Sequence, residues 1–335
     1  MKKITQHPID IVVAWVDGAD PVIRQKKTSF LKSNGSFFHP GAFQTRFHSL
    51  NEVEYCVLSI LKFAPFIRNI FIVTDQQDPK IDRAIKQYFP ERFRDIRIVD
   101  HKEIFEGYED YTPTFNSICI SNMLWRIKGL SDQFVYFNDD IFLLRPINPS
   151  DWFVNNKPVL RGKWRFSPYE RLLWDELKEK FMQFFTSKKH QERSASFQVN
   201  QWNAAKILGF RWRYFRSGHT PVALNKQTLK NYFDNHPEIL KKNISFRFRN
   251  YYQFNTVALA NHLEIKSGNK NRMKSQVIYL RPHKRVEDYV NRKLSIAGNN
   301  KNFLFICAQS LDLANVKDQE KIIQKMKVLL ELDIK

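Results

Sequence analysis

Three acidic residues come at the ends of apolar runs that have the character of buried strands. Asp17 follows residues 9–16, which are rich in β-branched side chains, and Asp139 and Asp140 follow the apolar run 134–137 after a single residue. In open α/β sheets, ligands bind just outside the carboxyl ends of the strands. We therefore expect the three carboxylates to share one crevice, where they suit Mg²⁺ or Mn²⁺ together with a phosphorylated donor.

The alternative for these acids is a purely local role in turns. Asp before Gly is common in turns, so Asp17 and Asp20 could simply cap the turn that follows the first run. For the pair Asp139–Asp140 a purely local role in a turn is less favourable, because an unpaired buried carboxylate is costly. We favour the functional interpretation. The neighbouring candidates for substrate binding are Trp15, Asp20 and Asn138.

His219 is the histidine whose setting is most suited to catalysis. Gly218 precedes it and Pro221 follows two residues later, which predicts a tight, non-helical backbone. A histidine presented in this way suits a general base that accepts the proton of a hydroxyl nucleophile. The alternative is a histidine in a surface loop, since most of the nine histidines must be structural.

Basic and aromatic residues alternate at 246–249. If this segment is a strand, Arg247 and Arg249 face the same side, and paired guanidinium groups suit a phosphate or diphosphate. A strand with one solvated face is the alternative. Arg46 is a weaker phosphate-binding candidate, and the run 281–285 is interpreted as solvated charge.

The elements that must position these residues alternate along the first 150 residues. Apolar runs predict strands at 9–16, 70–74, 96–99 and 134–137. Helices are predicted between them, from the capping box 49–52 to about residue 64, at 79–88, and from about residue 117. This order implies an α/β protein with a Rossmann-like, mostly parallel sheet. No strand is followed by Gly-x-Gly-x-x-Gly, which argues against a dinucleotide dehydrogenase.

The composition indicates a globular chain with an uneven charge. Of 335 residues, 43% are hydrophobic, and the three cysteines are far apart, which predicts a reducing compartment. Residues 1–150 hold 19 Lys/Arg and 18 Asp/Glu, whereas residues 151–335 hold 35 and 16. A basic half beside an acidic site attracts a polyanion. We expect neither a signal peptide nor a membrane span.

Four parts are predicted along the chain. Residues 1–150 form the nucleotide-sugar and metal-binding core, and residues 151–200 form a helical insertion with a helix at 169–185. Residues 201–315 complete the catalytic domain and carry the basic acceptor-binding surface. Residues 316–335 are expected to form an amphipathic helix, whose packing partner the sequence leaves open.

The order of these residues resembles the Stealth family, which includes bacterial capsular polysaccharide phosphotransferases and the animal N-acetylglucosamine-1-phosphotransferase. The stretch 9–21 resembles the first block of the family and 219–221 resembles the third. The second block is the most specific, and its matching segments are 46–47, 51–52, 59–60, 64–68, 72–75, 115–117 and 137–140. In the fourth block, residues 305–310 resemble a Cys-Ile-Asn-Asp run but lack its acid. The acidic turn 138–140 is similar to that of GT-A nucleotide-sugar transferases.

The resemblance implies transfer of a hexose-1-phosphate from a UDP-sugar, such as a UDP-N-acetylhexosamine, to a hydroxyl of a polyanionic glycan, with release of UMP. It implies that Asp17, Asp139 and Asp140 hold Mg²⁺ or Mn²⁺ and the donor diphosphate, and that Asn116 binds the donor or metal-bound water. His219 is the implied base, with Asp17 as its competitor. The phosphate clamps are Arg46, Arg247 and Arg249.

Such an enzyme would be cytoplasmic and peripheral at the inner face of the bacterial inner membrane, in contact with anionic lipid and capsule assembly proteins. One alternative is a GT-A-type glycosyltransferase that attacks the anomeric carbon and releases UDP. An alternative from another class is a nucleic-acid-binding protein, suggested by the basic half alone. We expect no nucleic-acid partner, because no nucleic-acid module is recognisable.

Overall fold

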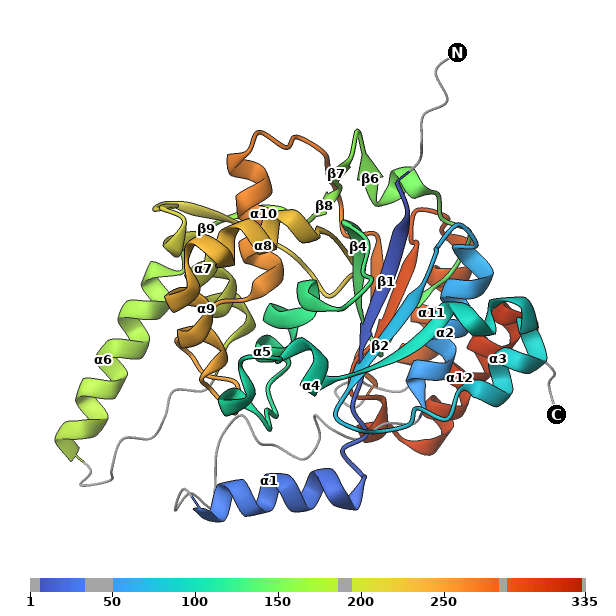
Figure 1. Ribbon diagram of the computed structural model, residues 1–335, viewed down its shortest axis with the longest axis horizontal. Coiled ribbons are helices and arrows are strands. Elements are labelled where there is room, and N and C mark those ends of the chain that lie inside the picture. Colours follow the sequence, from blue (N-terminus) through green and yellow to red (C-terminus); the bar gives the residue numbers. More distant parts are fainter. Residues whose placement is uncertain (1–6, 34–50, 186–194, 283–287, 333–335) are drawn as a thin grey trace.

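The central feature of the computed structural model, which describes residues 7–33, 51–185, 195–282 and 288–332, is a five-stranded sheet (Figure 1). Its strand order is β11-β4-β1-β2-β3. The bounds are β1 (Ile9–Ala14), β2 (Ile70–Thr74), β3 (Ile96–Asp100), β4 (Gln133–Asn138) and β11 (Val222–Asn225).

The four strands from the first 150 residues are parallel, and β11 alone runs antiparallel, against β4. The order β3-β2-β1-β4 matches the first four strands of a doubly wound sheet, in which the strand order switches between β1 and β4. The predicted α/β class and the mostly parallel sheet are therefore confirmed. The carboxyl ends of β1 and β4 lie side by side, since Ala14 is in register with Asn138.

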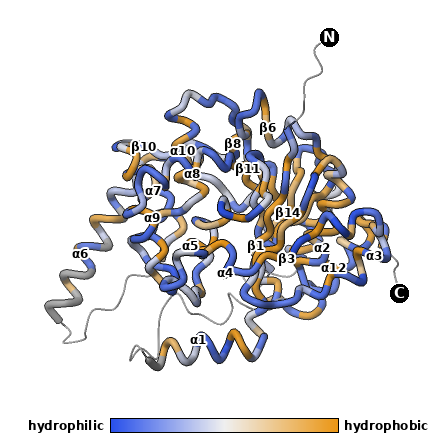
Figure 2. The backbone as a smooth tube through the Cα atoms, in the orientation of Figure 1, coloured by the Kyte–Doolittle hydropathy of each residue, from blue (hydrophilic) through white to orange (hydrophobic). Residues whose placement is uncertain are grey.

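Alternate residues of the central strands belong to two separate cores. Ile11 and Val13 pack with α2, α11 and α12, whereas Val12 packs with the helices of the opposite face. Figure 2 shows the resulting apolar centre of the sheet. A sheet covered on both faces explains why its strands are continuous apolar runs. The covering helices are α2 (Glu52–Phe63), α3 (Asp82–Tyr88), α4 (His101–Ile104), α5 (Ser117–Met123), α8 (Lys226–Asn235), α9 (Pro237–Ile244), α10 (Thr256–Lys266), α11 (Tyr289–Asn299) and α12 (Val316–Leu330).

A second, three-stranded sheet joins the segment after β4 to two strands of the C-terminal half of the chain. Its order is β13 (Val277–Leu280), β14 (Phe305–Ala308) and β5 (Ile141–Leu143). Because β5 follows β4 after the two residues Asp139 and Asp140, this pairing brings β14 up to the acidic turn. The C-terminal half of the chain thereby becomes part of the surroundings of that turn.

The predicted C-terminal helix is present as α12, and it packs on the core. Ile322, Met326 and Leu330 are buried against the cluster that includes α2, and Lys62 forms an ion pair of 2.8 Å with Glu331 at the end of α12. The apolar stripe of this helix therefore serves the interior of the molecule.

The helix predicted at 169–185 is present, whereas the start of the predicted insertion is not helical. Residues 151–168 contain short strands instead of helix, and the helices are α6 (Tyr169–Phe185) and α7 (Phe197–Ile207). The strands are β6 (Phe153–Val154), β7 (Lys157–Pro158), β8 (Leu160–Arg161) and β9 (Lys163–Phe166). Two of them pair with later strands, β8 with β12 (Arg272–Met273) and β9 with β10 (Arg213–Arg216). The remaining long helix, α1 (Pro21–Ser33), follows β1.

Two local predictions need correction. The segment 246–249 is not a strand, because it forms a bent loop between α9 and α10. Helix α2 begins at Glu52 with Asn51 as N-cap, and Asn51 makes no side-chain capping bond. Ser49 and Arg46 lie outside the described residues.

The division into four parts stays a prediction. Within the described residues, no helix has the length and apolar character needed to cross a bilayer.

Buried His262 should make folding stability depend on pH. Its Nε2 accepts the Phe215 N–H at 2.9 Å, Nδ1 lies 2.6 Å from the Ala258 carbonyl oxygen, and burial lowers its pKa to about 4. Between this value and the ordinary value of 6.5, the unfolded chain binds more protons, so stability falls as pH falls. We expect a loss of about 2 kcal/mol between pH 7 and pH 5 from this residue. The free energy of unfolding of His262→Gln, measured with urea, should not show this part of the loss between pH 7 and pH 5. An equal pH dependence of stability in His262→Gln and wild type would contradict the expectation.

Candidate active site

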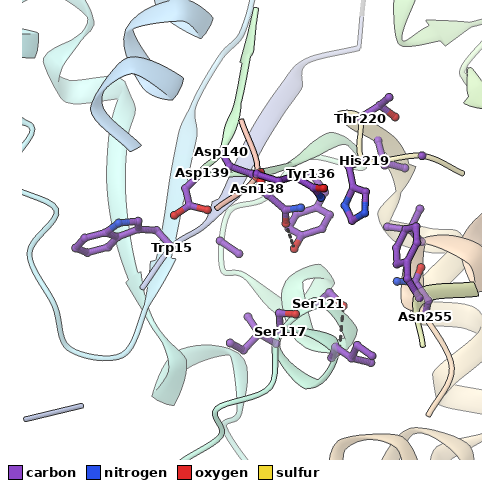
Figure 3. A pocket seen from close by; sticks show the side chains of 18 of the residues that line it. Trp15, Ser117, Ser121, Tyr136, Asn138, Asp139, Asp140, His219, Thr220 and Asn255 are labelled. Carbon is purple, nitrogen blue, oxygen red and sulfur yellow. Dashed lines mark hydrogen bonds between the residues drawn. The ribbon is translucent and has the colours of Figure 1, made fainter. Parts of the chain in front are cut away.

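A pocket of about 770 Å³ lies at the carboxyl ends of β1 and β4 (Figure 3). The ends of β1 and β4 and the helices α2 and α5 form one part of its wall, and segments of the C-terminal half form the rest. Its polar and aromatic lining residues include Trp15, Glu52, Ser117, Tyr136, Asn138, Asp139, Asp140, Phe197, His219, Arg249, Arg281, Gln309, Ser310 and Asp312. The prediction that the strand-end acids face a crevice therefore holds for the pair after β4.

The acidic turn is held from behind by strand β14. The Ala308 N–H donates to the main-chain oxygen of Asp140 at 2.9 Å, and the Cys307 thiol donates to its Oδ2 at 3.5 Å. These contacts follow from the antiparallel pairing of β14 with β5, which starts at the residue after the turn. The position of the Asp140 carboxylate is thus set by a strand 167 residues away in the sequence.

Burial, together with the charge of neighbouring acids, raises the pKa of both carboxyl groups. Burial raises the pKa of Asp139 well above its ordinary value, and the charges of Asp140 and Glu52 add to the effect. Burial likewise raises the pKa of Asp140 to about 6, although the Cys307 thiol opposes the shift. Three acids from α2 and the β4–β5 turn are therefore gathered where negative charge is poorly solvated.

The acidic turn fits a divalent cation. Oδ1 of Asp140 is buried and has no hydrogen-bond partner, although a buried carboxylate oxygen is normally satisfied. Mg²⁺ commonly uses one or two carboxylates and completes its shell with water and substrate phosphates. Over the described ranges, no group of three or more His, Cys, Asp or Glu is arranged to hold a metal. Asp139 and Asp140 would therefore share such a cation with oxygen atoms of a substrate.

His219 lies across the pocket from the acidic turn, in the loop between β10 and β11 (Figure 3). Its ring stacks on Phe197 at 4.4 Å and meets the edge of Tyr279 at 6.0 Å. Burial, followed by the charges of Arg281 and Arg249, lowers the pKa of His219 to about 4. The imidazole is therefore neutral at pH 7, which is the form that accepts a proton.

Gly218 controls how closely Tyr279 approaches this loop. The Tyr279 hydroxyl oxygen accepts the His219 N–H, and a Cβ atom on Gly218 would lie 2.5 Å from that oxygen. Gly218→Ala should push Tyr279 and His219 apart and lower the activity of the pocket about tenfold or more. Gly298→Ala is the matched control, because a Cβ atom there would meet only the end of the Lys325 side chain at 3.8 Å. Activity within twofold of wild type in Gly218→Ala would contradict the expectation.

The structure separates the two predicted phosphate-binding arginines. Arg249 lines the pocket, and its Nη2 donates to Ser117 Oγ at 2.6 Å. Arg247 instead donates to the main-chain oxygens of Asp110 and Pro113, and it does not line the pocket. A strand would have placed both on one side, but in this loop they diverge. Arg247 therefore braces the segment before α5.

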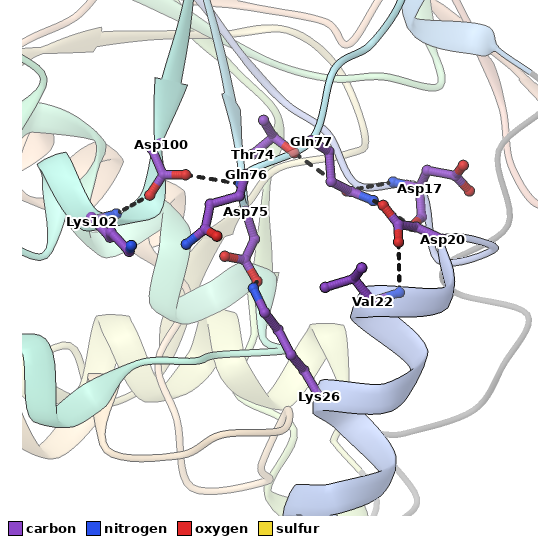
Figure 4. A network of polar contacts seen from close by, with 10 residues as sticks. All are labelled: Asp17, Asp20, Val22, Lys26, Thr74, Asp75, Gln76, Gln77, Asp100 and Lys102. Carbon is purple, nitrogen blue, oxygen red and sulfur yellow. Dashed lines mark hydrogen bonds and ion pairs between the residues drawn. The ribbon is translucent and has the colours of Figure 1, made fainter.

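Asp17 and Asp20 form a separate network at the end of β1, shown in Figure 4. Gln77 accepts the Asp17 N–H at 3.0 Å and donates to Asp20 Oδ2 at 2.9 Å. Oδ1 of Asp17 accepts the Ala19 N–H, and Oδ1 of Asp20 accepts the Val22 N–H at the start of α1. Neither lines the pocket. This corrects the expectation that Asp17 shares a crevice with the pair after β4, and it matches the capping alternative.

Asn116 is the buried cap of helix α5. Its side-chain oxygen accepts the Ile118 N–H at 3.0 Å, and its amide donates to the Phe246 carbonyl and to Gln253. Its side chain is fully buried and its bonds are internal. The residue predicted to bind the donor thus ties α5 to the loop before Arg249. Among the other predicted residues, Trp15 and Asn138 line the pocket.

Several pocket residues were not predicted from the sequence. Glu52 was interpreted as part of a helix cap, although an acid on an otherwise apolar helix face could have marked it. Arg281 follows β13, while Gln309 and Asp312 follow β14, so the strand-end rule applied to the C-terminal half would have found them. Asp312 lies just beyond the segment in which the acid of the fourth block is missing.

The fold and the site define an α/β protein whose acidic pocket lies at the carboxyl ends of parallel strands. Residues 46–160 match the family profile of Stealth protein CR2, conserved region 2. The chain thus carries the second conserved region of Stealth proteins, and the predicted resemblance to this family is confirmed.

Relatives with curated names match the same region. An exopolysaccharide phosphotransferase of Streptomyces coelicolor is 42% identical over 150 residues, which are 44% of this chain and 26% of that protein. The capsular polysaccharide phosphotransferase fcs1 of Haemophilus influenzae is 40% identical over 45% of this chain and 39% of its own length. The matches thus span well under half of these two relatives. The receptor polysaccharide phosphotransferase WefC of Streptococcus oralis is 29% identical over 78% of this chain and 79% of its own.

Among solved structures, the chain is similar to the galactosyltransferase LgtC in complex with donor and acceptor sugar analogs. The similarity covers 97% of each chain, with a TM-score of 0.45 and 11% identity.

Proposed function

We propose that this protein is a polysaccharide phosphotransferase that moves a hexose-1-phosphate from a UDP-sugar to a hydroxyl of an acceptor glycan and releases UMP. One observation carries the proposal. A pair of carboxylates with an unpartnered oxygen faces a neutral histidine and an arginine across one pocket. The relatives described above are polysaccharide phosphotransferases, which supports the same chemistry.

In the proposed step, the acceptor hydroxyl oxygen attacks the phosphorus that carries the sugar. A new P–O bond forms, the P–O bond to the UMP oxygen breaks, and the proton of the hydroxyl passes to His219. Because its pKa is lowered to about 4, His219 is free of a proton at neutral pH and can take this role. Arg249 binds phosphate oxygens, where it offsets the negative charge that builds up during transfer.

Asp139 and Asp140 would hold a divalent cation, Mg²⁺ or Mn²⁺, which when bound neutralises the diphosphate of the donor. Asn138 lies beside them on the pocket wall, and its side-chain oxygen accepts a hydrogen bond from the Tyr136 hydroxyl at 2.9 Å. Trp15 also lines the pocket, and its indole N–H is buried without a partner. We assign that N–H to a donor oxygen, because a buried donor left unpaired is costly.

We propose a UDP-N-acetylhexosamine as donor, as the resemblance to the Stealth family implies. We propose a growing polymer of sugar phosphates as acceptor, since 35 of the 54 Lys and Arg residues lie in the half after residue 150. We also propose that the enzyme works in the cytoplasm beside an anionic membrane face and contacts capsule assembly proteins.

A nucleotide-release assay tests the reaction. The purified chain is incubated with a panel of UDP-sugars, Mg²⁺ and a capsule-type oligosaccharide primer, and the nucleotide products are separated by chromatography. UMP, together with a phosphodiester signal in the ³¹P spectrum of the glycan, is the expected result. His219→Gln should abolish it, whereas His236→Gln, a change at an exposed histidine, should not.

The other outcomes identify the alternatives. Release of UDP with a glycan free of phosphorus would make the protein a glycosyltransferase and remove the proposed role of His219. No release, combined with tight nucleic-acid binding that weakens steeply with salt, would favour the nucleic-acid alternative.

A further inference from the structure

Helix α6 carries an apolar stripe that is largely exposed to solvent. Leu173, Trp174, Leu177 and Phe181 are between 58% and 68% exposed. Their spacing puts them within about 100° of one another around the helix axis. Figure 1 shows α6 extending away from the body of the molecule, with only its start against other elements. Single exposed apolar residues are common, but a continuous stripe of four marks a contact surface.

Two more exposed aromatic residues lie at the root of this helix. Phe166 and Trp212, on the β9–β10 ribbon, are 84% and 77% exposed. The Ser167 N–H donates to the Trp212 carbonyl at 2.8 Å, and the Tyr169 hydroxyl donates to the neighbouring carbonyl of Arg211 at 3.0 Å. These bonds join the ribbon to α6. The α6 surface is defined here as Phe166, Leu173, Trp174, Leu177, Phe181 and Trp212.

Basic residues flank the α6 surface. Lys163 and Arg165 on β9, and Arg211 and Arg213 around the start of β10, all have exposed side chains. In the sequence, residues 161–216 hold 13 Lys/Arg against 5 Asp/Glu. Figure 2 shows the same mixture of hydrophobic and hydrophilic segments along α6 and the ribbon. Exposed aromatic side chains beside cationic ones are the pattern of proteins that insert into the headgroup layer of a membrane.

We propose that the α6 surface docks the protein on a bilayer that contains anionic lipid. The apolar side chains would enter the boundary between headgroups and acyl chains, while the flanking Lys and Arg side chains bind lipid phosphates. A dissolved polyanion would use the charges but leave the apolar stripe exposed. In a symmetric pair of copies the same basic patch would face itself, which costs free energy.

The α6 surface is connected to the pocket by short stretches of chain. Strand β10 ends at Arg216, and His219 follows three residues later. Helix α7 begins at Phe197, whose ring stacks on His219 at 4.4 Å. Docking through α6 and the ribbon would therefore hold the pocket close to the membrane, where a membrane-anchored acceptor could reach it. The proposal does not depend on which reaction the pocket performs.

Co-sedimentation with vesicles tests whether the α6 surface docks the protein on an anionic bilayer. The full chain is mixed at low salt with vesicles of phosphatidylcholine alone or with phosphatidylglycerol added. We expect binding only to the anionic vesicles, with a blue shift of tryptophan fluorescence, because Trp174 and Trp212 leave water. The apolar variant Trp174→Ser/Leu177→Ser/Phe181→Ser and the charge variant Lys163→Gln/Arg165→Gln/Arg211→Gln should each lower the bound fraction about tenfold or more.

Matched controls carry the same changes elsewhere. Val22→Ser/Val316→Ser/Val328→Ser removes three exposed apolar side chains, and Lys241→Gln/Lys242→Gln/Lys317→Gln removes three exposed charges. Both should bind like wild type, and circular dichroism should show all variants folded. Absence of wild-type binding would overturn the proposal. Equal binding by the apolar variant would also overturn it, as would a stable dimer that this variant makes monomeric without any change in vesicle binding.

Discussion

Asp140→Asn is expected to lower the rate of nucleotide release about a thousandfold and, at the same time, to make the folded protein more stable. Asp140 presents a buried carboxylate oxygen without a partner, next to Asp139. If the pair holds a cation on the donor diphosphate, loss of one charge removes several kcal/mol of transition-state stabilisation, and each 1.36 kcal/mol corresponds to a factor of ten.

The expected gain in stability follows from the direction of the pKa shift. The pKa of Asp140 is raised from 3.8 to about 6 in the folded protein, so between these values the folded state binds more protons than the unfolded chain. Stability therefore falls as pH rises through this window, and at pH 7 the charged carboxylate costs about 1 to 3 kcal/mol. Asparagine keeps the shape but carries no charge, so Asp140→Asn should melt at a higher temperature.

Thermal unfolding at pH 7 and nucleotide release measured on the same preparation check both parts. Asp132→Asn is the matched control, because Asp132 precedes the same strand but is exposed, and its side chain accepts a hydrogen bond from the Gln227 amide. It should change neither quantity appreciably. A variant that is both less stable and fully active would show that Asp140 serves the fold and not the reaction.

In contrast to Asp140→Asn, Asp10→Ala should greatly lower the stability of the folded protein. Asp10 lies at the start of β1 and is fully buried. Its carboxylate accepts hydrogen bonds from Arg68 Nε and Nη2, at 2.9 and 2.6 Å, and from the N–H groups of Asn69 and Ser131. The Arg68 side chain is 43% exposed, so its charge stays in contact with water when the carboxylate is removed. The two main-chain N–H groups lose their acceptor, and at about 1–3 kcal/mol for each buried donor the expected loss is about 2–6 kcal/mol.

Urea unfolding with linear extrapolation measures this loss. Asp82→Ala provides the comparison, since Asp82 forms a long, exposed ion pair of 3.8 Å with Lys86, and surface pairs contribute at most about 1 kcal/mol. If Asp10→Ala cost less than about 1 kcal/mol, the four hydrogen bonds would contribute little to folding. Ligand binding in the pocket should be retained by the folded fraction, because Asp10 lies at the opposite end of β1.

The main elements of the sheet were predictable from the sequence because β1, β2 and β4 are apolar runs with both faces buried, and the partly exposed edge strand β3 is also rich in β-branched residues. The strands β1, β2, β3 and β4 appear where the runs 9–16, 70–74, 96–99 and 134–137 predicted them. The segments whose structure was predicted wrongly lack such a pattern. Residues 151–168 form two-residue and four-residue strands whose partners, β10 and β12, are far along the chain, so local pattern carries little information about them.

The acids illustrate the same limit within the site. Asp10, Asp17 and Asp140 all adjoin apolar runs, yet one anchors an arginine, one holds a turn and one faces the pocket. The sequence indicates that an acid lies near a buried strand. It does not indicate which groups surround the carboxylate, since those come from distant segments such as Arg68, Gln77 and Cys307.

The sequence by itself determined the α/β class, the carboxyl-end acids after β4, the loop histidine and the excess of positive charge after residue 150, because these depend on residue type and on short-range periodicity. Only the tertiary structure decided that Glu52, Arg281 and Asp312 share the pocket, that Arg247 turns away from it, and that the apolar stripe of α12 is covered while that of α6 is exposed. Burial and pairing depend on contacts between segments far apart in the chain, and side-chain chemistry alone does not specify those contacts.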